Sequence, residues 1–169
     1  WTRKLGGFGL EDALDITTDT AGSIYATGLF FTTASFDPIA GSQVLNSTGT
    51  WDFDVFVSKL DPTGKLVWAK SFGGIDDDVG WRLYIDRHND ILTSGIFENT
   101  ADFDPDTSSM TMTSVGQYDL FLHKMSQCQH SISNISVSAC NSYHSPSGLY
   151  TWTASGIYTD TVVNALGCD

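Results

Sequence analysis

The chain has 169 residues, of which 41% are hydrophobic and 17% are charged, enough for a packed core in one ordinary domain or slightly more. The net charge of −12 argues against a nucleic-acid partner, because phosphate groups would be repelled. No apolar run approaches the roughly 20 residues of a membrane helix, so membrane insertion is not expected.

Most of the chain reads as short strands separated by turns. Strands are expected over 14–18, 23–30, 54–60 and 65–70, where β-branched and aromatic residues are frequent. The segment 61–64 is a turn, with Pro at its second position and Gly at its fourth. Four short strands within about 65 residues is the size of a large blade of a β-propeller.

This strand pattern occurs twice. Residues 1–38 align with residues 68–105 without a gap, at an offset of 67. After a two-residue deletion, residues 54–59 align with residues 119–124. The second copy ends after its third strand.

The first copy has the patterns W-x-x-x-x-G-G, D-x-x-G-x-I-Y-x-T-G-x-F, F-D-P and D-x-F-x-x-K-L-D-x-x-G. The second copy, over 68–125, matches them more loosely: it departs at 89–92 and retains only D-x-F-x-x-K of the last pattern. Together these motifs resemble the SBBP-type bacterial β-propeller repeat. The resemblance implies an extracellular propeller of several blades. Two copies cannot close a ring, since propellers need roughly four to eight blades. The expectation is therefore missing blades upstream, an open stack of repeats, or assembly of several chains.

The composition changes after residue 125, and from Cys128 onward there is no Lys or Arg. The motifs A-C-N-S-Y, S-P-S-G-x-Y-T-W-T, S-G-x-Y-T-D-T and G-C-D lie within residues 139–169. They resemble a Cys-containing tandem β-module of large proteins that Bacteroidetes export by type IX secretion. The resemblance implies a disulfide between Cys140 and Cys168, and a Cys128–Cys140 pair is the rival. Because no CxxC pair is present, a disulfide in an oxidising compartment fits the cysteines better than zinc.

The predicted fold is all-β, a partial β-propeller of two four-stranded blade-like repeats followed by the start of a small β-sandwich-like module. The predicted domains are propeller-type repeats over 1–125 (copies 1–67 and 68–125), a linker over 126–138 and an incomplete Ser/Thr-rich β-module over 139–169.

Two acidic clusters are candidate calcium sites. Asp102, Asp104 and Asp106 alternate along the chain, and Asp76 and Asp78 belong to an acidic run after a Gly-Gly pair. Carboxylate oxygens are the ligands that Ca²⁺ prefers. The alternative is a solvated loop whose carboxylates bind nearby backbone amides. No other cofactor is expected.

Two further sets of residues are candidates for ligand binding and modification. Trp51 and Tyr118 are placed in the same loop of each copy, where they would either stack on carbohydrate or pack internally. Thr20 and Thr161 each follow Asp and precede a small apolar residue, which resembles the O-glycosylation motif of Bacteroidetes.

The sequence predicts no enzyme, because it lacks GxSxG, its four histidines are scattered and its acids fall mainly in repeated turns. The leading hypothesis is a non-catalytic structural or adhesive module at the bacterial cell surface, part of a larger secreted repeat protein. Its partners would be other segments or subunits of a surface assembly, or polysaccharide. The alternatives are a carbohydrate-binding module of a secreted enzyme, and a propeller hydrolase or lyase completed by further blades.

Overall fold

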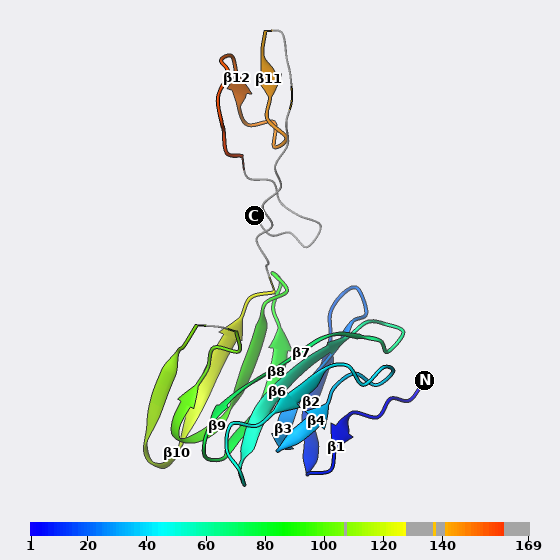
Figure 1. The fold of residues 1–169 in the computed structure, drawn as a ribbon, viewed down its shortest axis with the longest axis vertical. Helices are drawn as coiled ribbons and strands as arrows, with labels where there is room; N and C mark the ends of the chain where they lie inside the picture. The colour runs from blue at the N-terminus through cyan, green and yellow to red at the C-terminus, as the bar shows by residue number, and fades with distance from the viewer. Residues whose placement is uncertain (107, 128–136, 138–140, 161–169) are drawn as a thin grey trace. The chain divides into compact units, whose positions relative to one another are not determined.

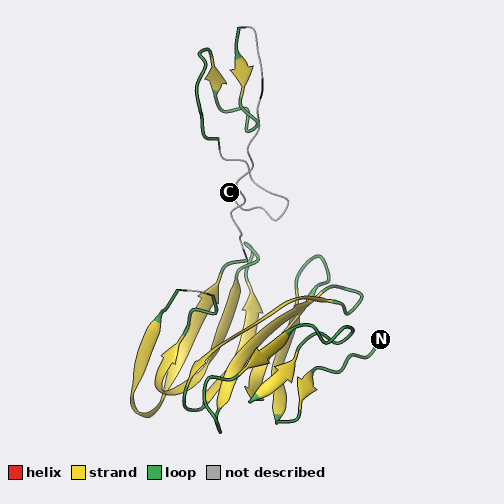
Figure 2. Cartoon of the chain, in the orientation of Figure 1, coloured by secondary structure: helices red, strands yellow, loops and turns green. Residues whose placement is uncertain are grey.

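The computed structural model describes residues 1–106, 108–127, 137 and 141–160. The chain divides into two compact units, Trp1–Ser126 and Gln127–Asp169. Every regular element in the described residues is a β-strand, as Figure 2 shows, which confirms the predicted all-β fold class. No helix in this part of the chain is long and apolar enough to cross a membrane.

The first repeat forms a four-stranded antiparallel sheet. Its strands are β2 (Glu11–Thr18), β3 (Ile24–Phe31), β6 (Phe53–Leu60) and β7 (Leu66–Gly74), in the spatial order β7-β6-β3-β2 (Figure 1). The strands are rich in Val, Ile, Thr and Phe, which pack well on a pleated surface. This arrangement is the expected blade.

The second repeat forms three strands, β8 (Asp78–Ile85), β9 (Ile91–Asp102) and β10 (Thr111–Met125), with β9 between the other two. The end of β7 also pairs with the end of β9, through Gly73 and Gly74. Because of this pairing, the strands of both repeats belong to one seven-stranded sheet.

Three short strands reproduce that junction at the start of the first repeat. They are β1 (Gly6–Gly7), β4 (Thr33–Ser35) and β5 (Val44–Asn46). The Gly-Gly pair of β1 lies opposite the last two residues of β4, as the Gly-Gly pair of β7 lies opposite the end of β9. The repeat seen in the sequence is therefore also a repeat of strand register.

Thr32 and Asn99 mark the bend in the second strand of each repeat. Their φ angles are 59° and 54°, in the left-handed region that L-residues rarely adopt. The amide of Thr32 donates to Ser47 Oγ, and the amide of Asn99 donates to Ser114 Oγ, at 3.0 and 2.9 Å. The same backbone strain is stabilised in the same way twice.

The larger hydrophobic core contains residues of both repeats, so the repeats do not have separate interiors. It comprises Tyr25, Val55, Val57, Phe72, Leu83, Ile91, Phe97, Ala101, Phe103, Phe121 and Met125. A smaller cluster in the first repeat comprises Phe30, Ala34, Phe36, Phe56 and Ala69. The packing of one repeat on the next therefore contributes to the larger buried apolar cluster, and burial of apolar surface is the dominant favourable term in folding.

The second unit contains the two short strands β11 (Tyr143–His144) and β12 (Thr151–Trp152), which pair antiparallel. The Trp152 ring stacks on Tyr158 with centroids 4.8 Å apart. Asp160 accepts hydrogen bonds from the amide and hydroxyl of Ser147, at 2.7 and 2.6 Å. Aromatic stacking and this carboxylate organise the described part of the module.

Candidate functional site

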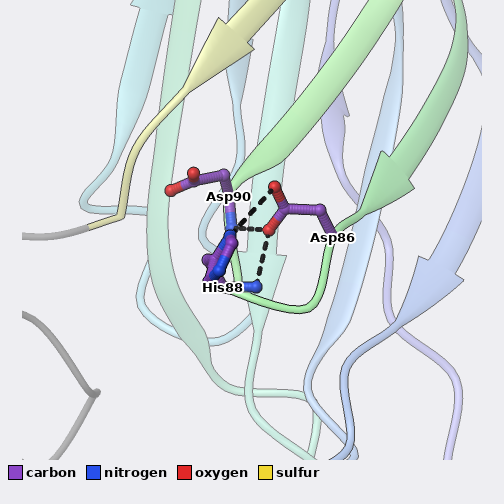
Figure 3. A group of neighbouring side chains, drawn as sticks. All are labelled: Asp86, His88 and Asp90. Carbon is purple, nitrogen blue, oxygen red and sulfur yellow. Dashed lines mark hydrogen bonds and ion pairs between the residues drawn. The ribbon is translucent and has the colours of Figure 1, made fainter.

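The turn between β8 and β9 brings together Asp86, His88 and Asp90, whose potential metal-ligating atoms lie within 4.8 Å of one another (Figure 3). This group was missed from the sequence, where only the spacing D-x-H-x-D signalled it. Asp86 Oδ1 accepts the amide hydrogens of His88 and Asp90 at 2.8 and 2.9 Å. An Asp that binds amides two and four residues ahead is a common means of holding a turn.

Lys124 supplies a positive charge to this turn. Its Nζ lies 3.2 Å from Asp86 Oδ2 and 2.8 Å from Asp90 Oδ2. Desolvation raises the pKa of Asp86, but backbone hydrogen bonds from Asp90 and His88 and the nearby Lys124 hold it below its ordinary value. The ammonium group of Lys124 takes the place that a metal ion would need between the two carboxylates. We therefore interpret this turn as structural.

The first repeat has the same arrangement without the histidine. Asp19 Oδ1 accepts the amide hydrogens of Ala21 and Ser23. Lys59 Nζ lies 3.7 Å from Asp19 Oδ2 and 4.9 Å from the centre of the Tyr25 ring. Since the motif recurs with a different residue in place of His88, the histidine is not needed for it.

A second group of carboxylates lies at the junction of the two repeats, where Asp54 at the start of β6 faces Asp78 at the start of β8. Asp54 is 2% exposed and Asp78 is 1% exposed. A Cβ atom added to Gly73 would lie 2.6 Å from Asp78 Oδ2 and 3.0 Å from Asp54 Oδ1. Because glycine has no side chain, Gly73 leaves space in which the two carboxylates approach each other.

Each carboxylate of this pair has one oxygen with partners and one without. Asp54 Oδ2 accepts hydrogen bonds from the amide and hydroxyl of Thr48, both at 3.0 Å. Asp78 Oδ2 accepts the amide hydrogen of Gly74 at 2.5 Å. The two Oδ1 atoms are buried and have no hydrogen-bond partner among the described residues.

Burial raises the pKa of both groups. Desolvation is the main cause for Asp54, whose pKa rises to about 6 although hydrogen bonds from Thr48 oppose the change. Desolvation also raises the pKa of Asp78 to about 7, with a further contribution from the negative charge of Asp54. Close, buried carboxylates disfavour each other's ionised form.

The structure places the predicted calcium residues of the second acidic loop in separate roles. Asp102 Oδ1 accepts the amide hydrogens of Asp104 and Met110 at 3.0 and 2.8 Å. Asp104 Oδ1 accepts the amide hydrogen of Asp106, and Asp106 forms an ion pair with Lys70 at 2.6 Å. Calcium binding by this loop stays a prediction.

The aromatic candidates lie in different positions of their repeats. Trp51 is 79% exposed in the loop before β6, and its ring centroid is 6.2 Å from that of Phe31. Tyr118 is 41% exposed within β10, opposite Glu98. The register makes Tyr118 the counterpart of Phe53 rather than of Trp51, so the two do not occupy the same loop.

The remaining predicted residues are mostly outside the described part of the chain. Cys140, Cys168 and Thr161 lie there, as does Cys128. Thr20 is exposed in the turn between β2 and β3, where a modifying enzyme would reach it.

Equivalent residues of the two repeats differ sharply in burial at the ends of the sheet. Val55 and Val57 of β6 are fully buried, whereas their counterparts Leu120 and Leu122 of β10 are 70% and 81% exposed. We call the exposed pair the β10 face. No repeat covers this face among the residues that the structure describes.

The opposite end of the sheet shows the converse difference. Leu83 of β8 is 6% exposed and shares the large core with Val55 and Val57, whereas its counterpart Ile16 of β2 is 67% exposed. We call this surface around Ile16 the β2 face. A hollow of about 300 Å³, lined in part by Leu122, adjoins the β10 face. The two faces are the unpaired halves of the junction seen inside the chain.

Comparison with known proteins finds a distant relative. No family model matches the chain, and no solved structure matches it. The chain is 21% identical over 169 residues to an uncharacterised WD repeat-containing protein of Acanthamoeba polyphaga mimivirus, an alignment that covers 91% of this chain. The chain spans only 11% of that relative's length. This chain is an all-β, partial β-propeller, and most of the chain is distantly similar to part of a WD repeat-containing protein.

Proposed function

We propose that this chain is a non-catalytic structural or adhesive segment of a larger extracellular repeat protein, which presents a row of propeller-type blades. The observation that carries the proposal is the pair of open faces, the β2 face and the β10 face, which match the two halves of the internal junction. The distant likeness to a WD-repeat protein favours a repeat scaffold.

The open faces favour the addition of further repeats from head to tail. Burying a Leu or Ile side chain contributes roughly 1.5–3 kcal/mol, so covering Ile16, Leu120 and Leu122 would stabilise the array. A contact between two different faces closes into a ring or continues as an open stack. Either outcome gives the rigid platform that a surface protein needs.

Analytical ultracentrifugation of the chain at increasing concentration tests this proposal. We expect head-to-tail association of the wild-type protein and its loss in the double variant Leu120→Lys, Leu122→Lys. Ile39→Lys is the matched control, because Ile39 is also exposed (62%) but lies in the loop between β4 and β5. A wild-type chain that stays monomeric at the highest concentration would contradict the proposed role of the two faces.

We further propose that the repeats are of the bacterial SBBP type, and that the parent protein is exported to the surface of a Bacteroidetes cell by type IX secretion. The repeated motifs and the motifs of residues 139–169 support this assignment. Brief protease treatment of intact cells of the producing bacterium should release peptides of this chain. Release only after cell lysis would refute the surface location.

A carbohydrate-binding module of a secreted enzyme is the second candidate, favoured by the exposed Trp51 ring beside Phe31. Aromatic faces exposed in a loop can stack on sugar rings. Glycan-array binding that is lost in Trp51→Ala or Tyr118→Ala and retained in Trp81→Ala would support it. An array without signal would remove this candidate.

A further inference from the structure

The junction of the two repeats contains a pair of buried acids that the sequence alone did not bring together. Asp54 and Asp78 are at least 98% buried, and both have an Oδ1 atom without a hydrogen-bond partner among the described residues. Asp54 Oδ1 and Asp78 Oδ2 converge on the space above Gly73. A buried carboxylate oxygen without a partner is costly, so the pair requires either a proton or a cation.

The charges around the pair favour a cation. The neighbouring segments also carry Asp52, Asp76 and Asp77, and the negative charges of Asp52 and Asp76 raise the pKa values of Asp54 and Asp78. In the part of the chain that the structure describes, the ion pairs of Lys and His all involve other acids. One shared proton would neutralise one of these charges, whereas a divalent cation would compensate two.

The first and the second repeat each carry one further acid at an equivalent position on their outer faces. Glu11 occupies the position of Asp78 in the first repeat, and its Oε2 atom would lie 2.7 Å from a Cβ atom added to Gly6. The Oε1 atom of Glu11 is buried without a partner. Asp119 of β10 occupies the position of Asp54. Each outer face thus carries one acid of the kind that is paired at the internal junction.

We propose that Asp54 and Asp78 bind a divalent cation, Ca²⁺, which joins the third strand of one repeat to the first strand of the next. Ca²⁺ is bound by oxygen ligands and accepts flexible geometry, which suits two carboxylates supplemented by backbone oxygens or water. The cation would hold the inter-repeat junction closed. Asp78 was a predicted calcium residue, and Asp54 is its newly assigned partner.

Isothermal titration of the chain with CaCl₂, after treatment with EGTA, tests the site directly. We expect binding by the wild-type protein, and a dissociation constant raised about tenfold or more in Asp54→Asn and in Asp78→Asn. The titration uses a protein concentration at which the chain is monomeric, and Glu11→Gln is the matched control, because Glu11 has the place of Asp78 in the first repeat but would meet a counterpart of Asp54 only at a junction between chains. Its calcium affinity should be unchanged.

Thermal unfolding of the same variants provides the second measurement. Calcium should raise the melting temperature of the wild type and of Glu11→Gln, and should leave that of Asp54→Asn and Asp78→Asn unchanged. A cooperative transition in EGTA shows that a variant is folded. Absence of calcium uptake by the wild type would overturn the proposal and assign a shared proton to the pair. Equal calcium uptake by a folded Asp54→Asn variant would also overturn it.

Discussion

Val55 and Leu120 occupy the same position in the two repeats, yet Val55 has no exposed surface whereas Leu120 is 70% exposed. The next repeat makes the difference, because β8 packs against β2, β3 and β6 and covers the side chains of β6. Gly80 of β8 permits this close approach, since a Cβ atom there would lie 2.7 Å from Val55 Cγ1. The equivalent surface of β10 has no such cover in the described residues.

The neighbouring pair Val57 and Leu122 gives a direct test of this difference. Val57→Ala should lower the free energy of unfolding by about 2 kcal/mol, because it removes methyl groups from a packed core. Leu122→Ala should change it by less than about 0.5 kcal/mol in the monomer, because the side chain is 81% exposed. Urea denaturation of both variants measures the two effects, and equal losses would show that β10 is covered in solution.

The two lysine–aspartate pairs should also differ in strength. The Lys59 side chain is 15% exposed and faces the Tyr25 ring, whereas the Lys124 side chain is 54% exposed. Lys59→Met should therefore destabilise the protein by about 1–3 kcal/mol, since it leaves the poorly solvated Asp19 carboxylate without its charge partner.

Lys124→Met should cost less than about 1 kcal/mol, as expected for a solvent-exposed ion pair. Chemical denaturation at low and high salt distinguishes the two cases, because screening weakens only the exposed pair. A larger loss of stability for Lys124→Met than for Lys59→Met would contradict this prediction. It would show that side-chain burial does not decide which ion pair matters more.

The left-handed residues permit a reciprocal exchange. Thr32 is β-branched and pays a larger conformational penalty at positive φ than Asn99, whose residue type visits this region more readily. Thr32→Asn should raise the free energy of unfolding by about 1 kcal/mol, and Asn99→Thr should lower it by a similar amount. Opposite changes in melting temperature would verify this, and changes of the same sign would contradict it.

The buried acids predict a pH dependence in the absence of calcium. The folded-state pKa values of about 6 for Asp54 and about 7 for Asp78 lie above the ordinary value of 3.8. Between about pH 4 and about pH 7 the folded protein therefore binds more protons than the unfolded chain. The stability that protonation of Asp54 and Asp78 contributes falls as the pH rises through this range, and it is lost above about pH 7.

Urea denaturation in EGTA at about pH 5 and about pH 8 measures this effect. The wild type should be less stable at the higher pH, and Asp78→Asn should reduce the difference because it removes one titrating group. An unchanged difference in Asp78→Asn would assign the pH dependence to other residues. Addition of calcium should also reduce the difference in the wild type, since the cation stabilises the ionised pair.

Local patterns carried much of the prediction. The alternation of apolar and polar residues predicted strands, and Asp, Pro and Gly at fixed offsets predicted turns. The turn at Asp61 shows why this works, because its Oδ1 atom accepts the amide hydrogens of Thr63 and Lys65, only two and four residues away. The offset of 67 likewise predicted that the strand pattern occurs twice, and the structure adds that the Gly-Gly pairs of both copies have the same strand register.

The candidate site depended on contacts between distant residues. Asp78 was singled out within an acidic run, but Asp54 lies 24 residues earlier and in a different repeat. Tyr118 was matched with Trp51, although the two-residue deletion makes it the counterpart of Phe53. Sequence position alone does not show which oxygen atoms are buried or which loop is shortened.

By itself the sequence determined that this protein is all-β, repeated and acidic, because strand alternation, turn chemistry and net charge are properties of neighbouring residues or of composition. The tertiary structure alone decided that Asp54 meets Asp78 and that Val57 is buried while Leu122 is exposed. The physical reason is that burial and charge proximity arise when one repeat packs on another, and identical positions have different surroundings when only one of them has a neighbour.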